Sequence, residues 1–322
     1  MVSTGAAAMA MADQHGAAMS RVGTAALGAG AALTATAGLA IKAANDWQSA
    51  WTGVTKTVDG ADLGGVLEGQ LRGLAQKLPA SHTERAAVAE AAGQLGVKRQ
   101  DVASFTKTMI DLGESTNMSA DVAATQIARF NNIMGIANSQ AKHLGSAIVD
   151  LGNSNATTES EIMDMSMRIA AAGRQVRMTA PEILALSASL TSVGVGAEAG
   201  GTSLSKFFVQ MDKAVSRGGK DLEVMAKTAG MTSDQFKKMY ESKGGAAKAF
   251  TEFEKGLGKM IKAGKGANEV MEDLGINEVR LTMALKSMAP NAEMIAKNID
   301  LATKAYEANA VSYTHLRAHE TS

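Results

Sequence analysis

Apolar residues recur at three- and four-residue steps through most of the chain, which is the spacing of one helix face. In the first two thirds, such stripes run over Val102–Leu112, Val122–Met134, Ile162–Ile169, Ile183–Val193 and Leu204–Val215. Later stripes run over Phe236–Tyr240, Phe250–Ile261 and Leu281–Met288. No stretch alternates at period two for long enough to predict a strand. The pattern therefore predicts an all-α fold, a compact array of short amphipathic helices.

Side-chain caps mark where these helices begin. In a capping box, a hydroxyl residue and a Glu or Gln three positions later bond each other's backbone N–H groups. This spacing occurs at Ser81/Glu84, Thr158/Glu161, Thr179/Glu182 and Thr232/Gln235. Ser119 is a weaker start, and Pro181 suits a first turn, where its missing N–H costs nothing. We predict that Thr179→Ala costs about 1 kcal/mol and that Glu182→Ala costs less.

Glycines are predicted to end the helices, because a helix commonly closes on a left-handed residue. The predicted stops are Gly93, Gly96, Gly113, Gly135, Gly152, Gly173, Gly194 and Gly196. Segments 84–114 and 159–196 share the order helix, glycine break, polar link, helix. They predict a weak internal repeat, in pattern rather than in letters.

The first 42 residues are rich in small side chains and are predicted to form a flanking hydrophobic helix. The uncharged stretch Val22–Ile41 is long enough to span a bilayer but has few large aliphatic residues. Its small residues suit close packing, either on other helices in water or in a host membrane, and both interpretations are open. Trp47 and Trp51 follow four residues apart, which predicts a helix anchored on its neighbour by two rings.

Composition narrows the functional classes. Lys+Arg and Asp+Glu are 32 each and no basic stripe is evident, which argues against DNA binding by charge and against sequence-specific nucleic-acid recognition. Cysteine is absent, so disulfides and thiolate metal sites are excluded. Aromatic residues are only 4% against 20 methionines, so small residues, leucine and methionine must fill the core.

Few residues suggest chemistry, and none forms a complete site. His315 and His319 have a metal-ligand spacing but no third ligand, and they lie in residues 311–322, which look like sequencing-adaptor read-through. His82 and His143 have no partner motif and are expected to be ordinary surface residues. We therefore predict no metal site, no cofactor and no enzymatic activity.

Two further patterns are explained by helix ends. Gly194-Val195-Gly196 and Gly200-Gly201-Thr202 look like phosphate-binding glycines, but no Gly-Lys-Ser/Thr follows and no strand precedes them. A turn between two helices is the preferred interpretation. The pair Glu159 and Glu161 stands at a helix start, where the helix dipole favours negative charge.

Several motifs, in the right order, resemble the core of phage tail tape measure proteins. Asp46-Trp47-Gln48 resembles the family's opening helix, although its usual acidic-aromatic pair is changed in order. Leu74 to Pro79 followed by Ser81 resembles a joint of that core, as do Gly93-Gln94-Leu95-Gly96 and Asn155-Ala156-Thr157. Ala180–Leu190, Gly194 and Glu198–Leu204 resemble its last two helices. The resemblance covers residues 43–215.

The resemblance implies a structural protein that lies in the lumen of the tail tube and sets tail length during assembly. Such proteins are made in the bacterial cytoplasm and leave the virion with the genome at ejection. The implied partners are the tail tube protein, tail assembly chaperones and baseplate or tail tip proteins, with the host membrane as a further partner through Val22–Ile41. Some family members carry peptidoglycan-cleaving domains, but nothing here resembles one.

The predicted division is a hydrophobic helix at 1–42, the tape-measure core at 43–215, a looser helical region at 216–310 and a non-native tail at 311–322. If the tail is foreign, the protein continues past about Ala310. Two alternatives remain: a membrane-active, pore-forming helical protein, and the non-catalytic part of a larger tail-associated peptidoglycan hydrolase.

Overall fold

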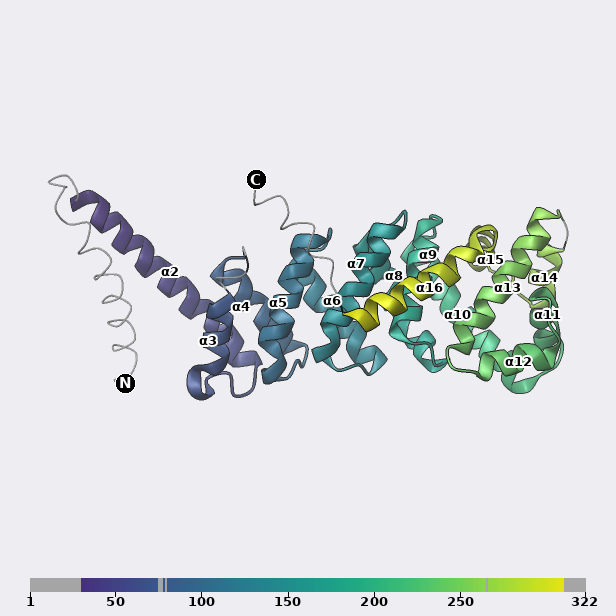
Figure 1. The fold of residues 1–322 in the computed structure, drawn as a ribbon, viewed down its shortest axis with the longest axis horizontal. Helices are drawn as coiled ribbons and strands as arrows, with labels where there is room; N and C mark the ends of the chain where they lie inside the picture. The colour runs from purple at the N-terminus through teal and green to yellow at the C-terminus, as the bar shows by residue number, and fades with distance from the viewer. Residues whose placement is uncertain (1–29, 75–77, 79, 265, 310–322) are drawn as a thin grey trace. The chain divides into compact units, whose positions relative to one another are not determined.

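The computed structural model describes residues 30–74, 78, 80–264 and 266–309, with the backbone alone for 30–41 and 43. All regular structure in these ranges is helical and no strand occurs in them, which confirms the predicted all-α class (Figure 1). Two units meet between Ser49 and Ala50, inside α2 (Gly30–Thr57). The predicted boundaries at 42/43 and 215/216 stay predictions.

Two predicted segments at the ends of the chain fall wholly or partly outside these ranges. Residues 22–29 of the predicted membrane stretch Val22–Ile41 lie outside the described residues, and so do residues 311–322. No helix in the described part of the chain is long and apolar enough to cross a membrane. Of the two tryptophans, Trp47 is buried and Trp51 is half-buried.

The second unit begins with seven α-helices joined by short links. They are α3 (Val66–Gly73), α4 (His82–Gln94), α5 (Arg99–Ser115), α6 (Ala120–Met134), α7 (Ala141–Ser154), α8 (Glu159–Gln175) and α9 (Ala180–Ser192). The 3-10 turns η1 (Leu63–Gly65) and η3 (Asn138–Gln140) precede α3 and α7. From α3 to α8, each helix packs on the next and on the one after it, which sorts the helices into two rows.

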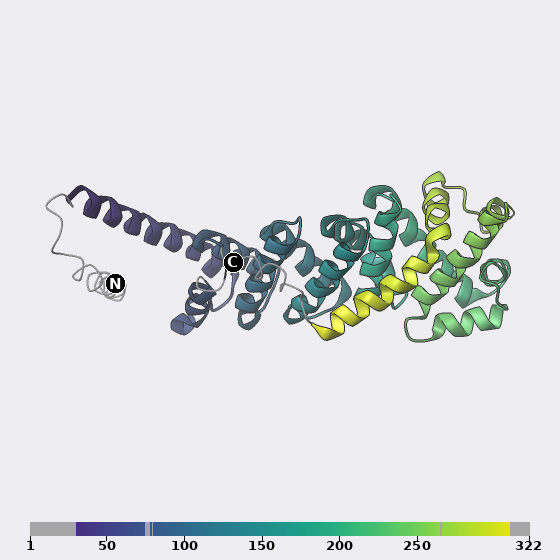
Figure 2. The ribbon, with the colours of Figure 1, turned by 45° about the horizontal axis from the view of Figure 1, so that its top comes forward.

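One row holds α4, α6, α8 and α10 (Ala197–Arg217), and the other holds α3, α5, α7 and α9. The remaining helices are α11 (Lys220–Thr228), α12 (Ser233–Glu241), α13 (Gly245–Lys262), α14 (Ala267–Asp273), α15 (Val279–Met288) and α16 (Ala292–Ala308), with η4 (Ala289–Asn291) before the last. α16, yellow in Figure 2, runs back along the second of these rows, where it packs on α7 and α9.

Four phenylalanines join α10 to α13. Phe207 lies with its ring centroid 6.0 Å from that of Phe250 and 5.3 Å from that of Phe253. Phe208 meets Phe250 edge-on at 5.5 Å. All four rings are buried, so they form one apolar core that continues past residue 215. We call α11–α15 the C-terminal cluster.

All four predicted capping boxes are present. In each, the hydroxyl accepts from the backbone N–H three residues on, while the Glu or Gln accepts from the N–H of the cap residue. Ser119 does cap α6 by position, but its side chain makes no capping bond to the helix backbone. Pro181 stands in the first turn of α9, as predicted.

Of the eight predicted glycine stops, three are right, four lie inside helices, and Gly196 stands at the start of α10 instead. Gly96, Gly135 and Gly194 have φ values of 78°, 71° and 81°, a left-handed conformation that suits glycine at a helix end. By contrast, Gly93, Gly113, Gly152 and Gly173 lie inside the last turns of their helices. There the neighbouring segment comes too close for a side chain: a Cβ on Gly113 would lie 3.0 Å from the backbone N of Ala120. These glycines therefore permit close packing against neighbouring segments rather than ending the helices.

A repeat in letters accompanies this packing. Ile110-Asp111-Leu112-Gly113 in α5 matches Val149-Asp150-Leu151-Gly152 in α7, the next helix of the same row. After each motif the helix ends two residues later and the chain turns extended, at Thr116 and Asn155 respectively. The structural repeat is thus a pair of helices, one from each row.

Helix α9 differs from the one-sided stripe predicted for it. Every residue from Ala180 to Leu190 is buried, because α7, α8 and α16 cover this helix from different sides. In α6, the predicted stripe residue Val122 is 41% exposed, and the buried face is centred on Ala123, Ala124 and Ile127. Small side chains make these contacts, so the positions of the large aliphatic residues do not identify the buried face of the helix correctly.

The capping box of α9 leads to a prediction that reverses the ranking expected from sequence. Thr179 is exposed, whereas Glu182 is buried and accepts a 2.7 Å bond from the Thr179 N–H. Glu182 also lies against Gly244 in the link before α13. We expect Thr179→Ala to cost about 1 kcal/mol. Glu182→Ala should cost about 1–3 kcal/mol, because it leaves the part-buried Thr179 N–H unpaired and a void where the buried side chain was.

Urea unfolding of both variants measures this difference. The box at Thr232/Gln235 is the matched control, because Gln235 is exposed. In this second box, Thr232→Ala should therefore lower the free energy of unfolding more than Gln235→Ala does. If Glu182→Ala and Gln235→Ala lowered the free energy of unfolding equally, the burial of Glu182 would not be the reason for its larger predicted effect.

Candidate functional site

The residues considered for chemistry do not come together. No group of three or more His, Asp or Glu residues that could hold a metal exists among the described residues. His315 and His319 lie outside those residues. His82 is exposed, with its Nδ1 2.8 Å from the Arg85 guanidinium. Partial burial and then the positive charges of Arg85 and Arg72 lower the pKa of His82, which favours the neutral ring.

His143 is more than an ordinary surface residue. Its Nδ1 lies 2.6 Å from the backbone oxygen of Tyr306, and the two rings approach to 5.2 Å. The Tyr306 hydroxyl donates to the side-chain oxygen of Gln140 at 2.8 Å, and burial raises the pKa of that hydroxyl. The end of α16 is thereby attached to the start of α7, so His143 has a structural role.

The glycine and carboxylate patterns also have structural roles. Gly194 and Gly196 stand in the link between α9 and α10, as predicted, but Gly200 and Gly201 lie inside α10. A Cβ on Gly201 would lie 2.6 Å from the Cβ of Arg168, so this glycine allows α10 to cross closely over α8. Glu161 is bonded by the Thr158 N–H and hydroxyl, which lower its pKa and keep it ionised at the helix start.

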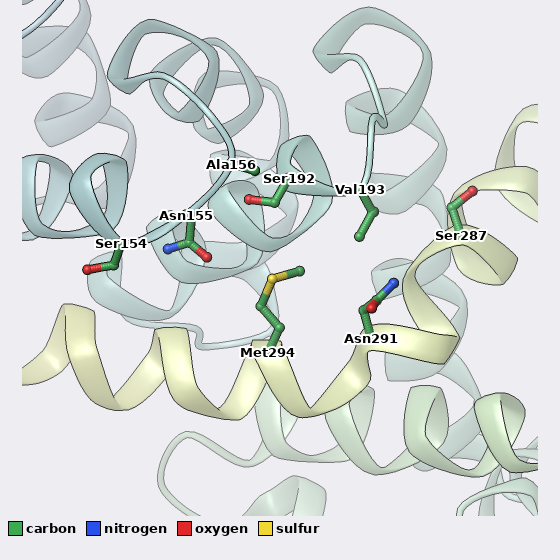
Figure 3. A pocket seen from close by; sticks show the side chains of 8 residues that line it. All are labelled: Ser154, Asn155, Ala156, Ser192, Val193, Ser287, Asn291 and Met294. Atoms are coloured by element: carbon green, nitrogen blue, oxygen red, sulfur yellow. The ribbon is translucent and has the colours of Figure 1, made fainter.

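A pocket of about 620 Å3 opens where α7, α9 and the turn into α16 meet (Figure 3). Its lining side chains are all uncharged: Ser154, Asn155, Ala156, Ser192, Val193, Ser287, Asn291 and Met294. The three serines have no His, Asp, Glu or Lys beside them in the lining, so none has a base to activate it. The Ser192 hydroxyl already donates to the Ala188 carbonyl at 2.6 Å. The pocket can offer hydrogen bonds, but it has no group for proton transfer.

A buried polar contact beside this pocket holds α16 in place. The Asn298 amide is 4% exposed and donates to Asn155 Oδ1 and to Ser189 Oγ, both at 2.9 Å. Asn155 ends α7 and donates in turn to the Leu151 carbonyl. Because a buried amide must keep its partners, this contact fixes the position of α16 along α7 and α9.

One buried acid was not singled out from the sequence. Glu254 of α13 is fully buried, and neither carboxyl oxygen has a hydrogen-bond partner. Desolvation raises its pKa well above the ordinary value, so the group is held neutral. The sequence pattern does indicate its burial, because residue 254 lies four positions after Phe250 and three before Leu257, on the apolar stripe of its helix.

The described residues thus form an array of packed helices with polar contacts between them, and its motifs serve packing and capping. The family of phage-related minor tail proteins matches residues 68–260. The chain belongs to this family. The match begins within α3 and ends within α13, so α14, α15 and α16 follow it. Comparisons with curated proteins and with solved structures find no match.

Membership gives this minor tail protein a structural role in the phage tail, and hence a location in the virion. The phage tail part of the resemblance is thereby confirmed. The matched range also extends beyond residues 43–215, through α11 and α12 and into α13. The joint 74–81 lies only partly in the described residues. In the link Asn155-Ala156-Thr157, the first two residues form part of the pocket wall.

Proposed function

We propose that this protein acts as the tape measure of the phage tail, which sets tail length during assembly and leaves with the genome at ejection. The family match over residues 68–260 carries the proposal, together with the ordered motifs that resemble tape measure proteins. In this role it lies in the lumen of the tail tube. Its partners are the tail tube protein, the tail assembly chaperones and the baseplate or tail tip proteins.

We further propose that the two-row array is an assembly-facing module rather than the part that measures. A single extended helix advances about 1.5 Å per residue. A pair of helices in two packed rows advances the array by only one interhelical spacing, about 8–10 Å. The glycine contacts hold consecutive helices of the two rows together, and the Asn298 contact joins α16 to α7 and α9, so the array has a fixed length.

The test is a deletion of residues 114–152 in the phage, which joins Gly113 to Asn153 and keeps the repeated motif before the turn. If the array were extended in the tube, tails would shorten by roughly 60 Å. We expect assembly to fail instead, because the deletion removes α6 and most of the surface that α16 covers on α7.

An in-frame deletion of equal length outside the array is the control. Electron micrographs should show intact tails that are shorter by roughly 60 Å. Intact, proportionally shortened tails from the 114–152 deletion would show that the array itself measures. Full-length tails from the control deletion would refute the tape measure role.

A further inference from the structure

A second groove, of about 610 Å3, lies between α8 and α10. Its walls include Arg168, Ala171, Ala172 and Gln175 of α8, and Lys206, Val209 and Lys213 of α10. On both helices these residues recur at three- and four-residue steps, so one face of each helix forms a wall. The groove therefore follows the helices for about two turns.

The walls of this groove are held in position. Gly201 allows α10 to approach Arg168 on α8, and the Ser205 hydroxyl donates to the Arg168 carbonyl at 3.1 Å. Gln210 donates through Nε2 to the Leu274 carbonyl at 2.6 Å, which attaches α10 to the segment before α15. A preformed groove of this kind loses little conformational entropy when it is occupied.

Positive charge surrounds an apolar floor. Arg168, Lys206 and Lys213 are exposed, and no acidic residue lines the groove. Lys206 pairs with Glu278, the residue before α15, whereas Arg168 and Lys213 form no ion pair within the described residues. The excess charge is local, because the chain as a whole is neutral.

Exposed apolar side chains stand close to Lys206. Val279 follows Glu278 directly and is 71% exposed, and Met283, one turn later on α15, is 63% exposed. They are two of the five exposed large apolar side chains in the described part of the chain. Exposed apolar side chains with charged residues around them are typical of a protein-binding site.

We propose that this groove binds an amphipathic helix of another protein, with its apolar stripe on the groove floor and acidic residues along its flank. Lys206 and Lys213 are seven residues apart, so they lie on one side of α10 about 10.5 Å from each other. Acidic residues seven apart on a docked helix have the same spacing. The Lys206–Glu278 pair is an example, within this chain, of a carboxylate bound at that position.

A helix suits the groove better than a nucleic acid does. The two neighbouring helices, with a floor of Ala171, Ala172 and Val209 between them, match the apolar stripe of a third helix. A nucleic acid bound through its phosphate backbone would instead leave this floor, and the exposed side chains of α15, without apolar partners. The proposal is independent of length control, and it concerns a surface that the tape measure role does not require.

The test uses the full chain and a fluorescently labelled helical peptide with a leucine and alanine stripe and glutamates seven residues apart on its flank. Fluorescence anisotropy should show binding that weakens with added salt. Arg168→Glu and Lys213→Glu should each weaken it by roughly tenfold. Lys237→Glu is the matched control, an exposed lysine on α12 away from the groove, and should leave binding unchanged.

A charge exchange makes the test specific. A peptide with lysines in place of the glutamates should bind the Arg168→Glu, Lys213→Glu double variant better than it binds the original chain. Circular dichroism and thermal melts check that each variant is folded. The proposal is overturned if the original peptide does not bind, or if Lys237→Glu weakens it equally.

Two other occupants would also overturn the proposal. Tighter binding of a single-stranded oligonucleotide of equal charge, with the same dependence on Arg168 and Lys213, would identify a nucleic-acid site. Self-association of the chain in sedimentation experiments, lost on Lys213→Glu, would identify a contact between two copies.

Discussion

Gly256→Ala should disrupt the C-terminal cluster and lower the free energy of unfolding by about 3 kcal/mol or more, at the upper end of overpacking effects. α13 crosses the end of α11 at this glycine. A Cβ there would overlap the carbonyl oxygen of Thr228 and lie 2.6 Å from its carbonyl carbon. These are backbone atoms, so no side-chain rotation relieves the clash. On another side of α13, Gly258 approaches the carbonyl of Ala289 in the same way.

Gly69→Ala is the matched control for this substitution. Gly69 lies inside α3, and a Cβ there would meet nothing within 4 Å. Alanine is the better helix former by about 1 kcal/mol, so this variant should be more stable than the original chain. Urea unfolding of both variants decides the point. A gain in stability for Gly256→Ala would contradict the close crossing of α11 and α13.

Replacement of Glu254 should stabilise the protein at neutral pH. Burial raises the pKa of this carboxyl above its unfolded value, so the folded state holds a proton that the unfolded state releases. Stability from this group is complete below the unfolded pKa and is lost as the pH rises towards the folded pKa. The original chain should therefore lose stability from about pH 4.5 upward, the ordinary glutamate pKa.

Glu254→Gln removes the proton linkage, and Glu254→Leu also removes the unpaired polar atoms. At pH 7 the leucine variant should gain about 1–3 kcal/mol, the cost of an unsatisfied buried polar group. Glu252→Gln is the control on the same helix, because Glu252 is only half-buried and pairs with Lys255, which also faces Glu293 on α16. That change should cost about 0–1 kcal/mol.

Unfolding measured between pH 4 and pH 8 tests the linkage. The difference in stability between Glu254→Gln and the original chain should grow with pH, whereas for Glu252→Gln it should not. Parallel pH profiles for the original chain and Glu254→Gln would mean that Glu254 is not held neutral in the folded state.

The candidate surfaces were only partly predictable from the residues. The motif Asn155-Ala156-Thr157 was recognisable, but its place in the pocket wall depends on Met294 and Asn291, which are far along the chain. Similarly, the period of Arg168, Ala171 and Gln175 is visible in α8, yet nothing local shows that α10 lies beside it. Residues distant in sequence form both surfaces, and a single amino-acid sequence carries no signal for their pairing.

Helix starts and the all-α class follow from the sequence by itself, because they depend on bonds within four residues. In any helix that begins at this position, the Thr179 hydroxyl accepts from the Glu182 N–H and the Glu182 carboxylate accepts from the Thr179 N–H. Only the tertiary structure shows which glycines lie inside helices, why α9 is buried on every side, and that Glu254 is fully buried. Each of these depends on a distant segment, such as α16 on α9 or the end of α11 on Gly256, and packing between distant segments overrides local preference.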